Sequence, residues 1–215
     1  MVEIGEHVPK FHVITDKNIS ELEKIIHTIG FPLIVKNTSS SGSRGTKIFY
    51  EYNFNDIKNM VIEAMKVSRS SKALIESVWV GSEHTVETLF DISGKFHKCF
   101  ITDRIFDKSS GFAIETGLIH PSRLSIKDQE LMYALAKNVS DSLGIKIGAS
   151  KFDMILTKDG PRIIEMTVRL SGGFDCQFLV PAATGKNVLK AAVLTASGKH
   201  FEDNLLTDSL NKTCV

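Results

Sequence analysis

Two short apolar runs joined by a tight turn decide the fold: Ser150–Leu156 (SKFDMIL), Lys158–Gly160 (KDG) and Arg162–Met166 (RIIEM). An Asp-Gly pair between two such runs is typical of a β-hairpin. Asp153 lies in the first predicted strand and Glu165 in the second, with Thr167 two residues further on. Side chains alternate between the faces of a strand, so Glu165 and Thr167 share one face, and the turn brings Asp153 across from it. We therefore expect two carboxylates and one hydroxyl to converge on this hairpin.

This convergence of oxygen atoms points to a magnesium site. Mg²⁺ prefers hard oxygen ligands and is usually held by one or two carboxylates together with substrate phosphates. The alternative is a solvated, charged hairpin, which is the commoner fate of Asp and Glu side chains. Apolar neighbours flank both acids, and partial burial is costly for a carboxylate without a partner. We predict that Asp153, Glu165 and Thr167 bind Mg²⁺, with Mn²⁺ as the alternative ion.

A run of small polar residues, Thr38 to Thr46, follows a predicted strand that ends at Lys36. Small side chains let backbone N–H groups approach phosphate oxygens, and a lysine adds a positive charge beside them. The loop is not a P-loop, because the G-x-x-x-x-G-K-[ST] pattern is absent. By composition alone, an ordinary flexible surface loop is the better interpretation.

The segment from Glu76 to Glu87 is a third candidate. An extended chain there offers backbone groups to the edge of a nucleobase, and Glu83 offers a carboxylate to ribose hydroxyls. An ordinary hairpin with surface acids explains the same pattern. Alone, this segment is weak evidence for a nucleotide site.

Hydrophobic periodicity predicts the remaining elements. The predicted helices span residues 21–29, 55–67, 125–143 and 182–197. The predicted strands outside the hairpin span residues 32–36, 47–50, 73–76, 83–91 and 96–103. Strands paired by short turns, with helices on one side, favour an α+β fold with mainly antiparallel sheets. We expect a small lobe at residues 1–75 and a large lobe at residues 76–215, with the strand at 73–76 as the hinge between them.

The bulk composition excludes several classes of function. The chain has 215 residues, of which 42% are hydrophobic and 24% charged, and its formal net charge is +1. This is the make-up of a soluble globular protein, with no whole-chain field that would attract nucleic acid or an anionic membrane. Cys99, Cys176 and Cys214 give neither a disulfide framework nor a zinc spacing, which favours a reducing compartment. No signal peptide or membrane-spanning apolar run is visible, so a cytoplasmic location is expected.

Taken together, the three candidate segments resemble the ATP-grasp superfamily, in particular its carboxylate–amine ligases. The resemblance covers most of the chain, from Pro9 to Lys199. The stretches that carry it are Phe31–Lys36 with the following Ser/Gly loop, Ala73–Glu76, Gly81–Glu87, Glu115–Ser122 and Ile163–Gly173. Asp153 stands where the family's first metal ligand is found. Each motif alone is loose, but their order and spacing together are specific.

The resemblance implies an ATP-grasp fold, in which two α/β lobes have the nucleotide cleft between them. In the small lobe it assigns Lys36 to the phosphates as a catalytic and nucleotide-binding residue. The loop residues that it places on the phosphates are Ser39, Ser40, Ser41, Gly42 and Ser43. The residues that it places near the adenine are Glu76, Ser77 and Val78.

In the large lobe, the resemblance places Glu83 near the ribose and assigns Ile155 and Ile164 to the nucleotide. Arg169 would face the transferred phosphoryl group as a catalytic residue, and Mg²⁺ would accompany ATP. The implied reaction is activation of a carboxylate as an acyl phosphate, followed by attack of an amine. Phosphoryl transfer depends mainly on positioning and charge neutralisation, which cationic side chains and Mg²⁺ supply. Arg104 and Lys151 are candidates for binding the carboxylate, although ion-paired surface roles fit them equally well.

Three departures from the family's pattern shape the remaining expectations. Thr167 stands where Asn is usual, so a second Mg²⁺ would bind more weakly, and Asp153 stands where Glu is usual. The family's preceding domain and linker helix are not in this sequence, which predicts a fragment, a split-gene subunit or a truncated form. The alternatives to a ligase are a nucleotide-binding subunit without turnover and a phosphotransferase on the same scaffold. The expected partners are a small-molecule carboxylate and amine, a missing N-terminal domain or partner subunit, and a second copy in a homodimer, but no nucleic acid and no membrane.

Overall fold

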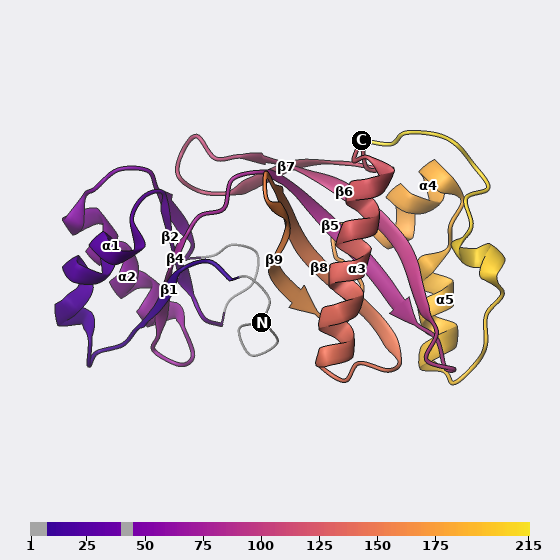
Figure 1. The fold of residues 1–215 in the computed structure, drawn as a ribbon, viewed down its shortest axis with the longest axis horizontal. Coiled ribbons are helices and arrows are strands. Elements are labelled where there is room, and N and C mark those ends of the chain that lie inside the picture. The colour runs from indigo at the N-terminus through magenta and orange to yellow at the C-terminus, as the bar shows by residue number, and fades with distance from the viewer. Residues whose placement is uncertain (1–7, 40–44) are drawn as a thin grey trace. The chain divides into compact units, whose positions relative to one another are not determined.

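A computed structural model describes residues 8–39 and 45–215 of the chain. The chain divides into two compact units, each of which is drawn in Figure 1. The small unit contains Pro9–Trp79 together with Phe106–Thr116, and the large unit contains Val80–Ile105 together with Gly117–Val215. Each unit has its own sheet and its own hydrophobic core.

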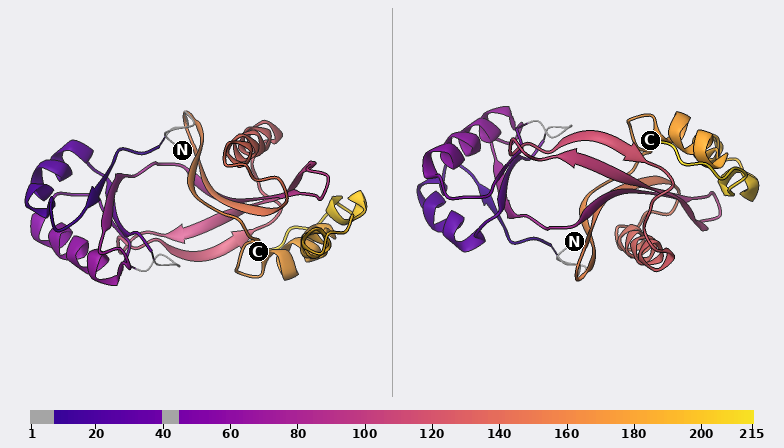
Figure 2. Two further views of the ribbon diagram at one scale, coloured as in Figure 1. Left: turned by 90° about the horizontal axis from the view of Figure 1, so that it is seen from below. Right: turned by 90° about the horizontal axis from the view of Figure 1, so that it is seen from above.

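The small unit is built on a four-stranded antiparallel sheet in the order β1-β4-β2-β3. Its strands are β1 (Phe11–Ile14), β2 (Leu33–Asn37), β3 (Lys47–Phe49) and β4 (Ala73–Ser77). The short turn η2 (Ile19–Glu21) leads into α1 (Leu22–Ile29), and α2 (Phe54–Val67) follows β3. Both helices lie on the same face of the sheet (Figure 2) and share one core with alternate strand residues.

The large unit is built on a five-stranded sheet in the order β7-β6-β5-β8-β9. Its strands are β5 (Ser82–Phe90), β6 (Phe96–Asp107), β7 (Ile114–Ile119), β8 (Gly148–Thr157) and β9 (Gly160–Thr167). Helix α3 (Ile126–Ser142) covers one face, where it packs on side chains such as Val86, Phe152 and Met154. Figure 2 shows α3 on one side of this sheet and the C-terminal helices on the other.

The C-terminal helices cover only part of the second face of the large sheet. They are η3 (Asp175–Leu179, a π-helical turn), α4 (Val180–Thr184), α5 (Val188–Ala196) and η4 (Asp203–Leu206). Their core contains Leu89, Phe100 and Val188, which lie toward one end of the sheet. The same face carries polar side chains further along the strands, and these form the candidate site described below.

The predicted α+β class, with mainly antiparallel sheets, is confirmed by the two sheets. The predicted hairpin is confirmed as β8 and β9, with Asp153 paired to Glu165. The single helix predicted at residues 182–197 is wrong. Gly185 adopts a left-handed conformation (φ +78°) that ends α4, and the Asn187 side chain accepts a hydrogen bond from the Lys190 N–H to start α5. Glycine at such a position is a common helix terminator.

Strands β1 and β7 had no counterpart in the predicted set. Both are short, and their exposed residues hide the period-two pattern on which a strand prediction depends. In the part of the chain that the structure describes, no helix is long and apolar enough to cross a membrane.

Candidate functional site

The second face of the large sheet carries a row of polar side chains across neighbouring strands. On β5, Glu83, Thr85 and Glu87 lie opposite Ile155, Asp153 and Lys151 of β8, respectively. Alternation along each strand puts these positions on one face. The polar groups therefore come from residues that are far apart in the sequence and that the antiparallel register brings side by side.

A β-bulge shapes the hairpin at the centre of this face. Asp153 pairs with Glu165, whereas the next residue, Met154, pairs with Ile163, so Ile164 is an extra residue in β9. Bulges re-aim the side chains around them and are common next to functional sites. Here the bulge lets Ile163 point into the α3 core while Glu165 stays on the polar face beside Asp153. The predicted convergence of the two acids is thus present in the backbone register.

Asp153 is held by two cationic side chains. Lys151 Nζ lies 2.6 Å from Asp153 Oδ1, and Arg104 Nη1 lies 3.0 Å from Asp153 Oδ2. The side chains of Lys151, Arg104 and Asp153 are only 11%, 17% and 8% exposed, respectively. Lys151 Nζ is also 4.0 Å from Glu165 Oε1. Lys151 and Arg104, considered above for binding a carboxylate substrate, contact the protein's own carboxylate in this structure.

Glu165 differs from Asp153 in its exposure. Its side chain is 60% exposed, so it opens toward solvent instead of being enclosed by its apolar neighbours. Partial desolvation, and after it the negative charge of Asp153, raise the pKa of the Glu165 carboxyl above its usual range. A shift of this kind is typical of two carboxylates that share a site.

The Thr167 hydroxyl completes the set of oxygen atoms. Thr167 lies opposite Lys151 in the hairpin register. Its Oγ1 is buried and has no hydrogen-bond partner within residues 8–39 and 45–215. A buried hydroxyl without a partner is costly, and such exceptions often mark a place where an ion or ligand binds. The residues present therefore fit Mg²⁺: a carboxylate open to solvent, a second carboxylate and an orphaned hydroxyl.

The protein's donors alone do not make a complete metal site. Among the described residues there is no group of three or more His, Cys, Asp or Glu side chains that could hold a metal ion. Mg²⁺ commonly takes only one or two protein carboxylates and fills its remaining positions with water and substrate phosphates. A metal ion at this hairpin would therefore need water or phosphate oxygens in addition to the protein's own donors.

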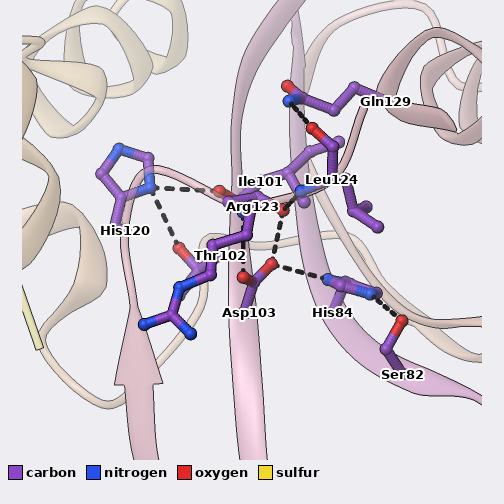
Figure 3. Close-up of polar contacts among 10 residues, drawn as sticks. Ser82, His84, Ile101, Thr102, Asp103, His120, Arg123, Leu124 and Gln129 are labelled. Carbon is purple, nitrogen blue, oxygen red and sulfur yellow. Dashed lines mark hydrogen bonds and ion pairs between the residues drawn. The ribbon is translucent and has the colours of Figure 1, made fainter. Parts of the chain in front are cut away.

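A network of hydrogen bonds braces β5 and β6 on the face opposite the acids (Figure 3). His84 Nδ1 lies 2.9 Å from Asp103 Oδ1, and His84 Nε2 lies 2.7 Å from the Ser82 hydroxyl. Asp103 also accepts hydrogen bonds from the Ser122 hydroxyl and from the Arg123 backbone N–H. Burial acts to raise the pKa of Asp103, but these hydrogen bonds outweigh it and hold the pKa below its usual range.

The brace fixes the neighbouring register position on the polar face. His84 pairs with Asp103, and the adjacent pair is Glu83 with Arg104. Because successive side chains point to opposite faces, an ordered His84–Asp103 pair on one side positions Glu83 and Arg104 on the other. No local pattern in the sequence indicated that His84 and Asp103 would pair.

Glu87 is a second buried feature that the sequence did not reveal. Its side chain is fully buried, and its Oε1 accepts a hydrogen bond of 2.6 Å from the Ser171 backbone N–H. Burial raises the pKa of Glu87 to about 8, against the opposing effects of the Ser171 hydrogen bonds and Lys151. The contact ties the segment after β9, which includes Arg169, to the middle of β5. Arg169 itself is exposed, and its Nη1 donates to the Leu170 carbonyl at 2.8 Å.

Two of the three residues predicted to surround the nucleotide within the large unit are neighbours in the sheet. Glu83 of β5 is directly opposite Ile155 of β8, which is buried, while Ile164 at the bulge is partly exposed. Gly81, just before β5, allows the chain to approach β8 closely. A Cβ atom there would lie 2.0 Å from the Leu156 carbonyl oxygen, so any other residue would force the strands apart.

In the small unit, the structure pairs two of the predicted residues with each other. Lys36 Nζ lies 2.5 Å from Glu76 Oε2, and their side chains are 25% and 14% exposed. Lys36 and Glu76 come from the neighbouring strands β2 and β4, on the face of the sheet away from the helices. The lysine and the glutamate therefore neutralise each other on that face of the sheet.

The remaining small-unit candidates have partners in their own unit. The Ser39 hydroxyl accepts from the Arg69 N–H at 2.7 Å. The Ser77 hydroxyl accepts from the Lys10 N–H at 3.1 Å, and the Val78 N–H donates to the Pro32 carbonyl at 3.1 Å. The predicted phosphate-loop residues Ser40, Ser41, Gly42 and Ser43 lie outside the described residues.

The sequence matches a known protein family and several curated proteins. The sequence pattern of the ATP-grasp domain family matches residues 29–177. The carbamoyl phosphate synthase large chain of Vibrio cholerae is 28% identical over 97% of this chain and 19% of its own length. The chain thus spans about a fifth of the length of this relative.

Two solved structures share the fold. An L-amino acid ligase from Bacillus licheniformis superposes with a TM-score of 0.73 and 23% identity, over 95% of this chain and 46% of that chain. The biotin carboxylase domain of a 2-oxoglutarate carboxylase from Hydrogenobacter thermophilus, solved with MgADP and bicarbonate, has a TM-score of 0.74 and 20% identity, over 96% and 46% of the two chains. The family match covers more than half of the sequence and agrees with the two antiparallel sheets and the acidic hairpin, so this chain belongs to the ATP-grasp family.

Proposed function

We propose that this chain is the nucleotide-binding part of an ATP-dependent ligase that joins a carboxylate to an amine. The observation that carries the proposal is the polar face of the large sheet, where Asp153, Glu165 and the orphaned Thr167 hydroxyl lie beside two cations. Oxygen donors and cations together suit a phosphate chain with its Mg²⁺. The family membership and the MgADP-bound relative support the same assignment.

In the proposed reaction, a carboxylate oxygen of the substrate attacks the terminal phosphorus of ATP and ADP leaves. The amine then attacks the carbonyl carbon of the acyl phosphate, loses a proton and displaces inorganic phosphate. Glu165, Asp153 and Thr167 would hold Mg²⁺ or Mn²⁺, which supplies charge neutralisation at the phosphates when bound. Arg169 is exposed next to this hairpin and would contact the phosphoryl group as it is transferred.

The nucleotide's other proposed contacts follow from the resemblance to ATP-grasp ligases. Lys36 would contact the phosphates together with the loop at residues 39–43, and Glu83 would accept from the ribose hydroxyls. Glu76, Ser77 and Val78 would border the adenine. Lys36 is now paired with Glu76, so binding of phosphates by Lys36 would have to break or share that ion pair. The apolar side chains of Ile155 and Ile164 would add contact area.

A second function is favoured by one observation. The chain spans about a fifth of the curated relative, and the substrate surface of a complete ligase can lie on parts beyond that span. In this case the chain would bind nucleotide and metal but turn over only with a partner domain or subunit.

The test is release of ADP from ATP, screened with pairs of carboxylates and amines, amino acids among them. ADP release that requires both substrates supports the ligase. Binding of Mg–nucleotide with no ADP release under any pair supports the binding module. Failure to bind Mg–nucleotide at all refutes both functions.

A further inference from the structure

The ammonium group of Lys151 lies between the two acids of the hairpin. Its Nζ lies 2.6 Å from Asp153 Oδ1 and 4.0 Å from Glu165 Oε1. Both carboxylates belong to the predicted metal site, so one ammonium group contacts oxygens that a bound metal ion would need. The Lys151 side chain is only 11% exposed, which distinguishes this contact from the exposed ion pairs that contribute little to structure.

The second carboxylate oxygen of Asp153 is also taken. Arg104 Nη1 lies 3.0 Å from Oδ2. Arg104 follows Asp103, which the brace in Figure 3 holds by hydrogen bonds from His84, Ser122 and Arg123. A planar guanidinium on a braced strand is a fixed partner, whereas a lysine on a flexible stem can move its charge.

The four side chains of this ion-pair cluster carry balanced formal charges. Asp153 and Glu165 contribute two negative charges, and Lys151 and Arg104 contribute two positive charges, so their formal sum is zero. A free divalent cation would have to displace two like charges that already contact the Asp153 oxygens, and their repulsion opposes its binding. The phosphates of a nucleotide carry negative charge. They would attract Lys151 and Arg104 when a metal ion neutralises the Asp153 carboxylate in place of these cations.

We infer that Lys151 stands in for the metal ion on Asp153 and Glu165 while the nucleotide is absent, so that the metal binds only together with the nucleotide's phosphate groups. This inference rests on the proposed function. On binding of a metal–nucleotide complex, the Lys151 ammonium would leave the carboxylates for a phosphate oxygen, and Asp153 and Glu165 would then be available to hold the metal. No covalent bond changes in this exchange.

The test is a Mn²⁺ titration of the full chain without nucleotide, in which the EPR signal measures free Mn²⁺. Lys151→Gln removes the positive charge, and Lys151→Arg keeps it. Lys137→Gln is the matched control, because Lys137 pairs with Asp141 on the exposed side of α3 in the same unit. We expect Lys151→Gln to bind free Mn²⁺ at least tenfold more tightly than the wild type. Lys151→Arg and Lys137→Gln should stay within twofold of the wild type.

Two further measurements complete the experiment. In the presence of ADP, the advantage of Lys151→Gln should vanish or reverse, because the lost ammonium no longer contacts a phosphate. Adding Glu165→Gln to Lys151→Gln should abolish the gained affinity, which locates the ion on the hairpin. Circular dichroism checks that each variant folds, and Lys151→Met, which keeps most of the stem, replaces Lys151→Gln if that variant does not.

Equal affinity of the wild type and Lys151→Gln for free Mn²⁺ overturns the inference, as does tight binding of free Mn²⁺ by the wild type. If the wild type binds Mn–ADP but Lys151→Gln shows no gain, the inference fails and the proposed function stands. If no variant binds Mn–ADP, the proposed nucleotide site fails. If Lys151→Gln still gained affinity for free Mn²⁺ in that case, Lys151 would compete with the metal ion, but the link to the nucleotide would be refuted.

Discussion

Replacing Glu87 with Gln should change how the stability of the protein depends on pH. Glu87 is fully buried, and one oxygen accepts the Ser171 N–H. Burial raises its pKa from 4.5 to about 8, so the folded protein holds a proton there that the unfolded chain releases. The contribution of this proton to the free energy of unfolding is at its full value below pH 4.5. It decreases as the pH rises through about 8, the pKa of the folded state. Gln keeps an oxygen for the Ser171 N–H but cannot ionise.

The magnitude follows from the size of this shift. One pKa unit corresponds to about 1.4 kcal/mol, and integration over the two titration curves gives a loss of about 2 kcal/mol between pH 6 and pH 8. This value is an upper figure, because local relaxation and water entry reduce the cost of a buried charge. The Glu87→Gln variant should lose less stability than the wild type over the same interval, by up to that amount.

The assay is denaturant unfolding of the wild type, Glu87→Gln and Glu130→Gln, followed by far-UV circular dichroism at pH 6, 7 and 8. Glu130 is an exposed acid of α3 that pairs with Lys98, and it serves as the charge-matched control. Because the chain has two compact units, the transition assigned to the large unit should be compared. Parallel pH profiles for the wild type and Glu87→Gln would refute the reasoning.

Three further substitutions test separate parts of the structure. Lys36→Ala should weaken binding of ADP by about tenfold, or ~1.4 kcal/mol, measured by calorimetry; unchanged affinity would remove Lys36 from the phosphate site. Gly81→Ala should destabilise the large unit by about 2 kcal/mol or more, because its Cβ would lie 2.0 Å from the Leu156 carbonyl oxygen; an unaltered denaturation midpoint would contradict that close approach. Asp103→Asn should cost about 2 kcal/mol through the loss of charge-assisted hydrogen bonds in the brace; a change below ~0.5 kcal/mol in denaturant unfolding would show that the brace contributes little.

The local features of the fold could be predicted from the sequence. The alternation around Asp153 and the Asp-Gly turn were enough to predict the hairpin and the convergence of its two acids, whereas the pairing of Asp153 with Glu165 depends on the bulge at Ile164. Helix α2 followed from its apolar spacing and begins at the Asn53 cap. In contrast, the helix break at Gly185 depended on a backbone conformation that sequence periodicity does not report.

The contacts that give the candidate site its charge could not be predicted in the same way. Arg104 of β6 reaches Asp153 of β8 across the intervening strand β5, and Glu87 reaches the Ser171 N–H over 84 positions in the sequence. Such pairs depend on the strand order β6-β5-β8-β9, which no local pattern fixes. The extra residue Ile164 shifts the alternation of β9, so that Ile163 and Glu165 face opposite sides although they are two residues apart, and regular periodicity does not predict such a shift.

The central claim is that the hairpin of β8 and β9 binds a metal–nucleotide complex. Its most direct test is calorimetric titration of ADP with Mg²⁺ into the wild type, Glu165→Gln and the Glu130→Gln control. The account predicts that the wild type and the control bind with equal affinity and that Glu165→Gln binds at least about tenfold more weakly, or ~1.4 kcal/mol. The melting curve of Glu165→Gln should match that of the wild type, because the Glu165 side chain is exposed. Equal affinity for Mg–ADP in all three proteins would contradict the account.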